Sequence, residues 1–185
     1  MKASQLLSRL EPVSADRLQA VADQLKAHEI KGIAYDSRRV GADFIFVAIK
    51  GGLTDGHRYL AEAMRKGACL AVVEETDDSL PLPQVQVASS RRALSRLSAA
   101  WFGDPSRDLV MTGITGSNGK TTTAMMLDTI LAENGLQAGM LGTIFYRVGE
   151  RIETADLTTP ESLELHGILR EQVNYGFKRS VMEVS

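Results

Sequence analysis

The positions of apolar residues predict helices in three parts of the first half of the chain. Apolar side chains recur every three or four positions in the stretches 3–25, 56–67 and 90–102, which places them on one face of a helix. Gly67 ends the second stretch, and glycine is the common residue just past the end of a helix. We therefore predict short N-terminal helices followed by two further helices.

Continuous apolar runs lie between these helical stretches, and turn residues bound each of them. The runs are "IKGIAYDSR" (30–38), "DFIFVAIKG" (43–51), "CLAVVEE" (69–75) and "QVQVA" (84–88). Short apolar runs between turns are typical of strands buried in a sheet. Because these strands alternate with helices, the sequence predicts an α/β fold with a parallel sheet that helices cover on both faces.

The pattern stops at "FGDPSRD" and begins again after it, because Gly103 and Pro105 break the helical period. We predict a domain boundary here, with a small α/β domain at 1–104 and the first part of a doubly wound parallel-sheet domain at 105–185. The elements expected in the second domain are strands at 109–115, 137–144 and 180–185, a hairpin around Val148–Gly149, a helix ending at Gly135, and a helix starting at Thr159–Pro160 with a hydroxyl N-cap.

Composition narrows the class of protein. The 185 residues are 44% apolar and 24% charged, as in ordinary globular proteins, and the net charge of −2 gives no reason to expect a nucleic acid partner. No run approaches the ~18 apolar residues of a membrane span, and the N-terminus lacks the apolar core of a signal peptide. We expect a cytoplasmic protein with no membrane partner. The single cysteine, Cys69, lies in an apolar run and is interpreted as a buried structural thiol rather than a nucleophile.

The end of the chain also carries an expectation. The residues after Asp108 supply only three or four candidate core strands, and the chain stops at Ser185, in the last of them. A parallel strand needs a crossover of about a dozen residues to reach its next neighbour. We expect this sequence to be part of a longer protein. The alternative is a compact domain whose last strand lies at the edge of its sheet.

The stretch "GITGSNGKTTT" (113–123) carries the strongest chemical signal. A strand, a glycine-rich turn and a helix N-terminus bind phosphate well, because backbone N–H groups and the helix dipole both favour an anion there. Lys120 is suited to the β- and γ-phosphates of a nucleotide, and the Thr121 hydroxyl to Mg²⁺. A lysine in the first turn of a helix is otherwise unfavourable, which argues against the alternative of a turn without a ligand.

This loop departs from the common phosphate-loop pattern, because Ile114 stands where the first glycine is usual and Gly113 comes one residue earlier. In that form it resembles the ATP loop of the Mur ligase family, G-x-T-G-[TS]-N-G-K-T-[TS]. The wider family includes folylpolyglutamate and cyanophycin synthetases, so the loop alone implies an ATP-dependent ligase that forms amide bonds.

Other stretches resemble particular parts of that family. The segment 35–68, beginning "YDSRRVGADF", resembles the N-terminal UDP-binding domain of the muramyl ligases. The segments "DLTTPESLELHGILREQVNYG" and "VMEVS" resemble the ligases that act on UDP-N-acetylmuramoyl-L-alanyl-D-glutamate. The resemblance therefore extends over nearly the whole chain, in the family's order.

The resemblance implies a set of site residues. Those implied to hold the ATP phosphates are Gly116, Ser117, Asn118, Gly119, Lys120, Thr121 and Thr122, with Lys120 catalytic. Those implied to hold the substrate are Tyr35, Ser37, Gly52, Leu53 and Thr54 for the UDP part, and Thr158, Thr159 and Ser185 for the muramoyl-dipeptide part. Thr121 and Glu183 are implied to hold Mg²⁺.

The residues by themselves support these roles unequally. Asp36–Ser37 and Asp55–Gly56 have a complete explanation as turns that end strands, and the Thr159 hydroxyl has one as a helix cap. Glu183 has a better functional case, since ligands of open α/β sheets bind at the carboxyl ends of parallel strands. The three histidines show no metal-ligand spacing and are interpreted as surface or packing residues.

The resemblance also implies a reaction. ATP transfers a phosphoryl group to a substrate carboxylate and leaves as ADP. The amine of an incoming diamino acid, meso-diaminopimelate or L-lysine, then attacks the acyl phosphate, forming the amide and releasing phosphate. The resemblance further implies that the present residues cannot complete this reaction alone, because a second metal site and the amino-acid site lie outside them. Two alternatives stay open at this point. One is a stand-alone nucleotide-binding module, and the other is a different muramyl or cyanophycin-type ligase.

Overall fold

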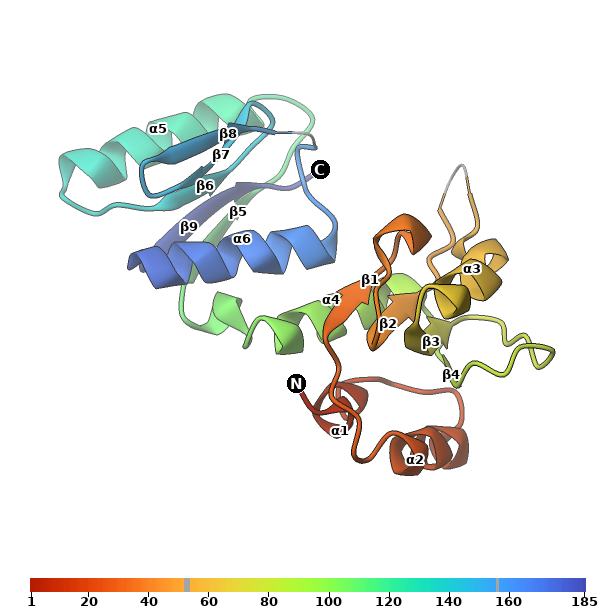
Figure 1. Cartoon of the computed structure of the whole chain (residues 1–185). Coiled ribbons are helices and arrows are strands. Elements are labelled where there is room, and N and C mark those ends of the chain that lie inside the picture. Colours follow the sequence, from red (N-terminus) through yellow and green to blue (C-terminus); the bar gives the residue numbers. More distant parts are fainter. Residues whose placement is uncertain (52–53, 156) are drawn as a thin grey trace. The chain divides into compact units, whose positions relative to one another are not determined.

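The computed structural model describes residues 1–51, 54–155 and 157–185. It divides into two compact units, Met1–Trp101 and Phe102–Ser185, which are described separately (Figure 1). No helix within the described residues combines the length and the apolar character needed to cross a membrane.

The first unit contains a four-stranded sheet in which all neighbours are parallel, in the order β1-β2-β3-β4. Its strands are β1 (Gly32–Ala34), β2 (Phe44–Val47), β3 (Ala68–Val73) and β4 (Gln84–Gln86). Its helices are α1 (Ala3–Leu7), α2 (Ala15–Gln24), α3 (Leu60–Arg65) and α4 (Ser90–Trp101), with short 3₁₀ turns η1 (Ser37–Arg39) and η2 (Gly56–Tyr59). The predicted helices and strands of this half are therefore confirmed, although the strands are shorter than the apolar runs.

Both faces of this sheet are buried. Phe46 of β2 packs into a core cluster with Leu60 and Ala63 of α3. Ile45 and Val47 alternate with Phe46 along the same strand and are also fully buried, and α4 contacts β2 and β3. Burial on two faces explains why these strands read as continuous apolar runs instead of an alternating pattern.

The second unit contains a five-stranded sheet in the order β5-β9-β6-β7-β8. Its strands are β5 (Val110–Ile114), β6 (Gly139–Leu141), β7 (Phe145–Val148), β8 (Arg151–Thr154) and β9 (Arg179–Glu183), and its helices are α5 (Lys120–Glu133), α6 (Ser162–Tyr175) and the 3₁₀ turn η3 (Pro105–Arg107). β5, β9 and β6 are parallel, whereas the β7–β8 hairpin is antiparallel. The sheet expected to be parallel is thus mixed, because the predicted hairpin joins its edge.

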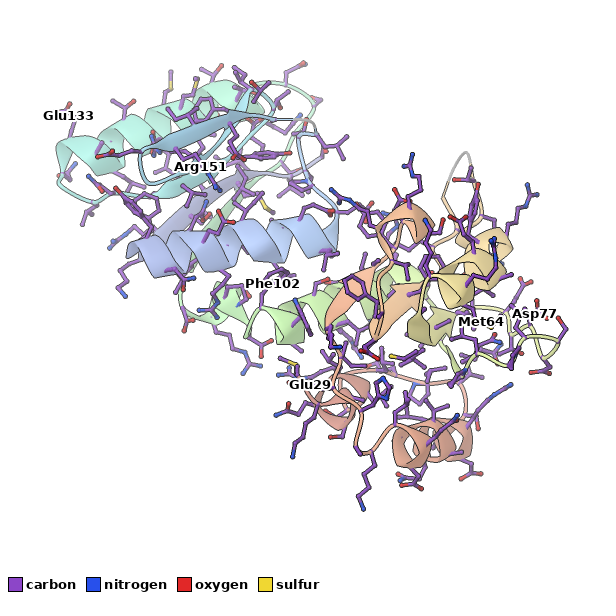
Figure 2. The ribbon with its side chains drawn as sticks, in the orientation of Figure 1. Glu29, Met64, Asp77, Phe102, Glu133 and Arg151 are labelled. Atoms are coloured by element: carbon purple, nitrogen blue, oxygen red, sulfur yellow. The ribbon has the colours of Figure 1, made fainter. Side chains whose placement is uncertain are left out.

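Helices α5 and α6 cover opposite faces of this second sheet (Figure 1). Met140 of β6 packs with Ala124 of α5, and its neighbour Leu141 packs with Leu169 of α6. Figure 2 marks Glu133 at the end of α5 and Arg151 at the start of β8. The two helices hold the central strands between two apolar layers.

The start of α6 differs from the prediction. The helix begins at Ser162 with Glu161 as its N-cap, and not at Thr159–Pro160. The Thr159 hydroxyl does not cap the helix, because it forms hydrogen bonds to the end of β9 instead. The predicted structural explanation for Thr159 is therefore wrong.

Candidate active site

The glycine loop connects β5 to α5 as predicted, and its geometry suits an anion. Gly119 is the N-cap of α5 with φ of 78°, a left-handed conformation that glycine adopts without strain. The first turn of α5 contains no acidic residue, and no side chain caps it. Its backbone N–H groups therefore remain available to a bound phosphate.

The loop is open to solvent. Five residues of the implied phosphate set are exposed, namely Gly116, Ser117, Asn118, Gly119 and Thr122. The ammonium group of Lys120 folds back over the loop and donates a hydrogen bond to the Gly116 carbonyl, with 2.8 Å between Nζ and O. The Lys120 ammonium group therefore lies beside the loop backbone, where it can contact the phosphate oxygens of a bound nucleotide.

Beside the loop, Glu183 stands at the carboxyl end of β9, the strand between β5 and β6. Its side chain is fully buried. The Thr121 hydroxyl donates to one carboxylate oxygen at 2.8 Å. The Thr143 hydroxyl donates to the same oxygen at 3.0 Å, and the Thr143 backbone N–H donates to the other at 3.0 Å. These three bonds offset the cost of burying a carboxylate.

Close approach to Glu183 requires a glycine at position 142. A Cβ atom on Gly142 would lie 2.5 Å from the nearer carboxylate oxygen, well inside contact distance. Gly142 and Thr143 together therefore form one wall of the Glu183 environment. Thr143 is not among the residues predicted for the site. It comes two residues after the end of β6, so its place near the carboxyl end of a parallel strand is the signal that could have identified it.

The residues around Glu183 fit Mg²⁺ better than a transition metal. One carboxylate and two threonine hydroxyls are oxygen donors, and Mg²⁺ in phosphate sites is commonly held by one or two protein ligands together with water and phosphate. In the part of the chain that the structure describes, no three His, Cys, Asp or Glu residues gather into a group that could hold a metal ion by themselves. A metal at Glu183 would thus depend on hydroxyl groups and on ligands from the nucleotide.

The implied dipeptide residues come together at the same end of the sheet. Thr159 Oγ1 donates to the Glu183 carbonyl at 3.2 Å and accepts from the Ser185 backbone N–H at 3.1 Å. The hydroxyl oxygens of Thr143 and Thr158 lie 3.2 Å apart. Because Thr143 has a single hydroxyl hydrogen, which the Glu183 carboxylate attracts most strongly, Thr158 is the donor in this pair. The structure therefore connects Thr158, Thr159 and Ser185 to the glycine loop through Glu183.

The implied UDP residues of the first unit are less clearly arranged. Ser37 is buried, and its hydroxyl donates to the Glu62 carboxylate at 3.1 Å, while Lys66 donates to the Ser37 carbonyl. Tyr35 is half-buried and Thr54 is exposed. Gly52 and Leu53 lie outside the described residues. The Ser37 hydroxyl donates its hydrogen within the protein, so toward a substrate it remains an acceptor.

The aspartates near these residues form turns, as their sequence context indicated. Asp36 caps η1 by accepting from the Arg38 backbone N–H at 2.9 Å, and the Arg38 guanidinium also binds its carboxylate. That hydrogen bonding with Arg38 lowers the pKa of Asp36 to about 2. Asp55 caps η2 through the His57 backbone N–H, and this bond is the main cause of its lowered pKa.

The histidines have structural roles in this arrangement. His57 Nε2 accepts from the Glu74 backbone N–H at 2.9 Å, so the ring proton lies on Nδ1 and is donated to Asp55. His28 pairs with Asp43. Burial lowers the pKa of His166. The contacts of His57 and His28 thus shape the loops around them, and His166 is partly buried.

Comparison with protein families gives two matches in chain order. Residues 29–102 match the family described as "Mur ligase family, catalytic domain", and residues 114–185 match the "Mur ligase middle domain". The second match begins in β5 and ends at Ser185, so it includes the glycine loop and the Glu183 cluster. The two matches together cover most of the chain.

The chain is also similar in sequence to individual ligases. The UDP-N-acetylmuramoyl-L-alanyl-D-glutamate–2,6-diaminopimelate ligase of Geobacter sulfurreducens is 42% identical over 158 residues, which are 85% of this chain and 31% of that protein. The chain thus spans about a third of the length of such relatives.

Solved structures extend the likeness to the fold. The MurF ligase of Thermotoga maritima in complex with ADP is 28% identical, with a TM-score of 0.52 over 82% of this chain and 31% of that one. A UDP-N-acetylmuramoyl-L-alanyl-D-glutamate–2,6-diaminopimelate ligase, 20% identical over 95% of this chain and 36% of that one, shares the fold with a TM-score of 0.72. With its two domain matches in the family's order and the family's ATP loop at the start of α5, the chain belongs to the Mur ligase family.

Proposed function

We propose that the protein carrying this chain is an ATP-dependent ligase of peptidoglycan precursor synthesis. It joins a diamino acid to UDP-N-acetylmuramoyl-L-alanyl-D-glutamate through an acyl phosphate. The observation that supports this most directly is the position of Glu183. Its buried carboxylate accepts from Thr121 of the glycine loop and from Thr143, and its backbone carbonyl accepts from Thr159. A phosphate cradle and a set of hydroxyls for a second substrate thereby meet at one end of one sheet. The 42% identical relative carries this activity in its name.

In this proposal residues 1–104 bind the UDP part of the substrate and residues 105–185 bind ATP. The loop from Gly116 to Thr122 holds the nucleotide phosphates through its backbone N–H groups and Lys120. Thr121 and Glu183 hold Mg²⁺, which supplies positive charge to the phosphates when bound. Lys120 has the same electrostatic task, because a carboxylate and a γ-phosphate repel each other as they approach.

The substrate residues receive their roles in the same way. In this proposal Tyr35, Ser37 and Thr54 bind the UDP moiety, and the same role is proposed for Gly52 and Leu53, which lie outside the described residues. Thr158, Thr159 and Ser185 bind the muramoyl-dipeptide. Three hydroxyls in one cluster suit a polar acceptor that carries carboxylate and amide groups, since each hydroxyl can both donate and accept.

The Lys120→Ala variant tests this function. Ligation is measured in the complete protein that carries this chain, and binding of the UDP substrate is measured by calorimetry. We expect ligation to be lost while the affinity for the UDP substrate stays close to that of the wild type. Lys178→Ala is the matched control, because Lys178 is exposed and precedes β9 at the end of the sheet away from Glu183. Retained ligation in Lys120→Ala, with both ligands still bound, would contradict the role of Lys120.

A second candidate within the family comes from the solved structures. The MurF ligase of Thermotoga maritima is 28% identical, whereas one diaminopimelate ligase of solved structure is 20% identical. The two candidates differ in their acceptor. Offering the UDP-linked dipeptide with meso-diaminopimelate or L-lysine, and separately the UDP-linked tripeptide with D-alanyl-D-alanine, distinguishes them by which product forms. Binding of ATP with no product in either assay would instead favour a stand-alone nucleotide-binding module.

A further inference from the structure

Tyr146 of β7 makes an unusual contact with the segment that precedes α6. Its ring packs with the core cluster under α6, which includes Leu141 and Leu169. Its phenol oxygen lies beside Leu157, where it donates to the backbone carbonyl and accepts from the backbone N–H. The distance from the Leu157 nitrogen to the phenol oxygen is 3.3 Å. One side chain thus binds both polar backbone groups of one residue.

Leu157 itself contributes little packing, because 57% of its surface is exposed. Its position therefore depends on the backbone bonds to Tyr146 more than on its own side chain. The next two residues are Thr158 and Thr159, whose hydroxyls contact Thr143 and the end of β9. A substrate that binds to those hydroxyls would compete for these side-chain bonds. The Tyr146 bonds are made to the backbone and do not compete with it.

We propose that Tyr146 is the positioning residue that holds Thr158 and Thr159 in place for the muramoyl-dipeptide. This inference rests on the proposed function. The inference also gives the antiparallel hairpin a role. Tyr146 of β7 pairs with Leu141 of β6, and this register places the Tyr146 ring where its hydroxyl reaches the Leu157 backbone. Ordering the threonine segment before the substrate arrives avoids an entropy cost on binding. Tyr146 acts through the threonines and does not itself contact the reacting groups.

The test compares Tyr146→Phe with Tyr175→Phe in the full 185-residue chain. Tyr175 lies in the same unit, is exposed, and packs its ring on Phe177. Calorimetry with the UDP-linked muramoyl-dipeptide should show affinity lowered roughly three- to tenfold by Tyr146→Phe, as expected for the loss of one hydrogen-bonding group. Tyr175→Phe should leave this affinity unchanged, and neither variant should change the affinity for ATP.

A double-mutant cycle with Thr158→Ala separates positioning from a general structural role. If Tyr146 acts through Thr158, Tyr146→Phe should have a clearly smaller effect on acceptor affinity in the Thr158→Ala background than alone. If Tyr146→Phe lowers the acceptor affinity by the same factor in the wild-type and Thr158→Ala backgrounds, the proposal is overturned. Hydrogen exchange adds a measurement without the acceptor: the Leu157 amide should exchange faster in Tyr146→Phe, while amides of β9 keep their protection. Faster exchange throughout β9 would mean that the variant loosens the whole unit, and the positioning role would be rejected.

The outcomes also separate this inference from the proposed function. A wild-type chain that binds ATP but no UDP-linked dipeptide overturns the proposed function and the inference with it. A wild-type chain that binds the dipeptide, together with a Tyr146→Phe variant that binds it equally well, overturns the inference alone.

Discussion

Thr121, in the first turn of α5, donates its hydroxyl hydrogen to Glu183 at the end of β9 across 2.8 Å, although 62 residues separate them in the chain. Thr143, two residues after the end of β6, donates to the same carboxylate oxygen. One buried carboxylate therefore joins three elements that arrive at the same end of the sheet. Changes at any of them should alter both the stability of this unit and its binding of nucleotide.

Gly142→Ala should disturb this carboxylate by volume alone. The added Cβ atom would lie 2.5 Å from the nearer Glu183 oxygen, so the carboxylate or the strand end must move. We expect a loss of about 1–3 kcal/mol in the free energy of unfolding, as for other overpacked sites, with weaker Mg²⁺–ATP binding. Urea denaturation and nucleotide titration measure the two effects. Gly113→Ala is the control, since its Cβ would meet only Val184 at an ordinary 3.5 Å; similar effects of the two variants would refute the steric argument.

Thr143→Val should remove a hydroxyl donor from Glu183 while keeping the size of the side chain and the backbone N–H. A buried carboxylate that loses one donor costs about 1–3 kcal/mol of stability. Thr143→Ser keeps the hydroxyl donor and should therefore retain most of the stability of the wild type. Thermal unfolding of the three proteins, compared at neutral pH, provides the measurement. If the valine and serine variants unfold alike, the Thr143 hydroxyl has no part in stabilising Glu183.

Ionised Asp36 should stabilise the first unit, and this stabilisation should be lost in acid. Hydrogen bonding with Arg38 lowers its pKa from 3.8 to about 2. A depressed pKa means that the folded state favours the ionised form, so the stabilisation is present above the unfolded pKa and is lost as the pH falls through the folded value. We expect the stability difference between wild type and Asp36→Asn to be full near neutral pH and to shrink between about pH 4 and pH 2.

Urea titrations at several pH values measure this difference. Arg38→Gln serves as the companion variant, because removing the guanidinium should bring the pKa of Asp36 back toward its ordinary value and flatten the pH dependence. A stability difference that stays constant down to the lowest pH would show that ionisation of Asp36 does not contribute.

Local pattern was sufficient to predict most of the fold. The sequence of β3 is a continuous apolar run because both faces of the strand are buried. The glycine loop is recognisable as a phosphate site because all of its residues are contiguous in the chain. Gly67, with φ of 100°, lies just past α3 as predicted. In the glycine loop and at Gly67, the interactions that determine the structure lie within a few residues of one another, whereas β3 is recognised from its composition alone.

The remaining features depend on contacts between distant residues. Thr159 follows the rules for a helix cap, yet α6 begins at Ser162 because β9 supplies better partners for the hydroxyl. Thr143 reaches Glu183 only because β6 and β9 are neighbours in the sheet. The order of strands within a sheet is not encoded in the period of any one strand, so these partners could not be predicted from the pattern.

Cys69 offers a test of the first unit that requires no ligand. It is half-buried, less than the sequence suggested, and its thiol donates to the Phe44 carbonyl. Burial raises the pKa of this thiol from 9.0 to about 11. Because only the thiolate reacts with iodoacetamide, a shift of this size lowers the reactive fraction near neutral pH about a hundredfold. Alkylation of the native chain should therefore be slower than in urea by roughly that factor, and should accelerate steeply with rising pH.

Mass spectrometry follows the reaction without ambiguity, since the chain has one cysteine. Equal rates in the native and unfolded chain would show that the thiol is not protected by the packing between β2 and β3.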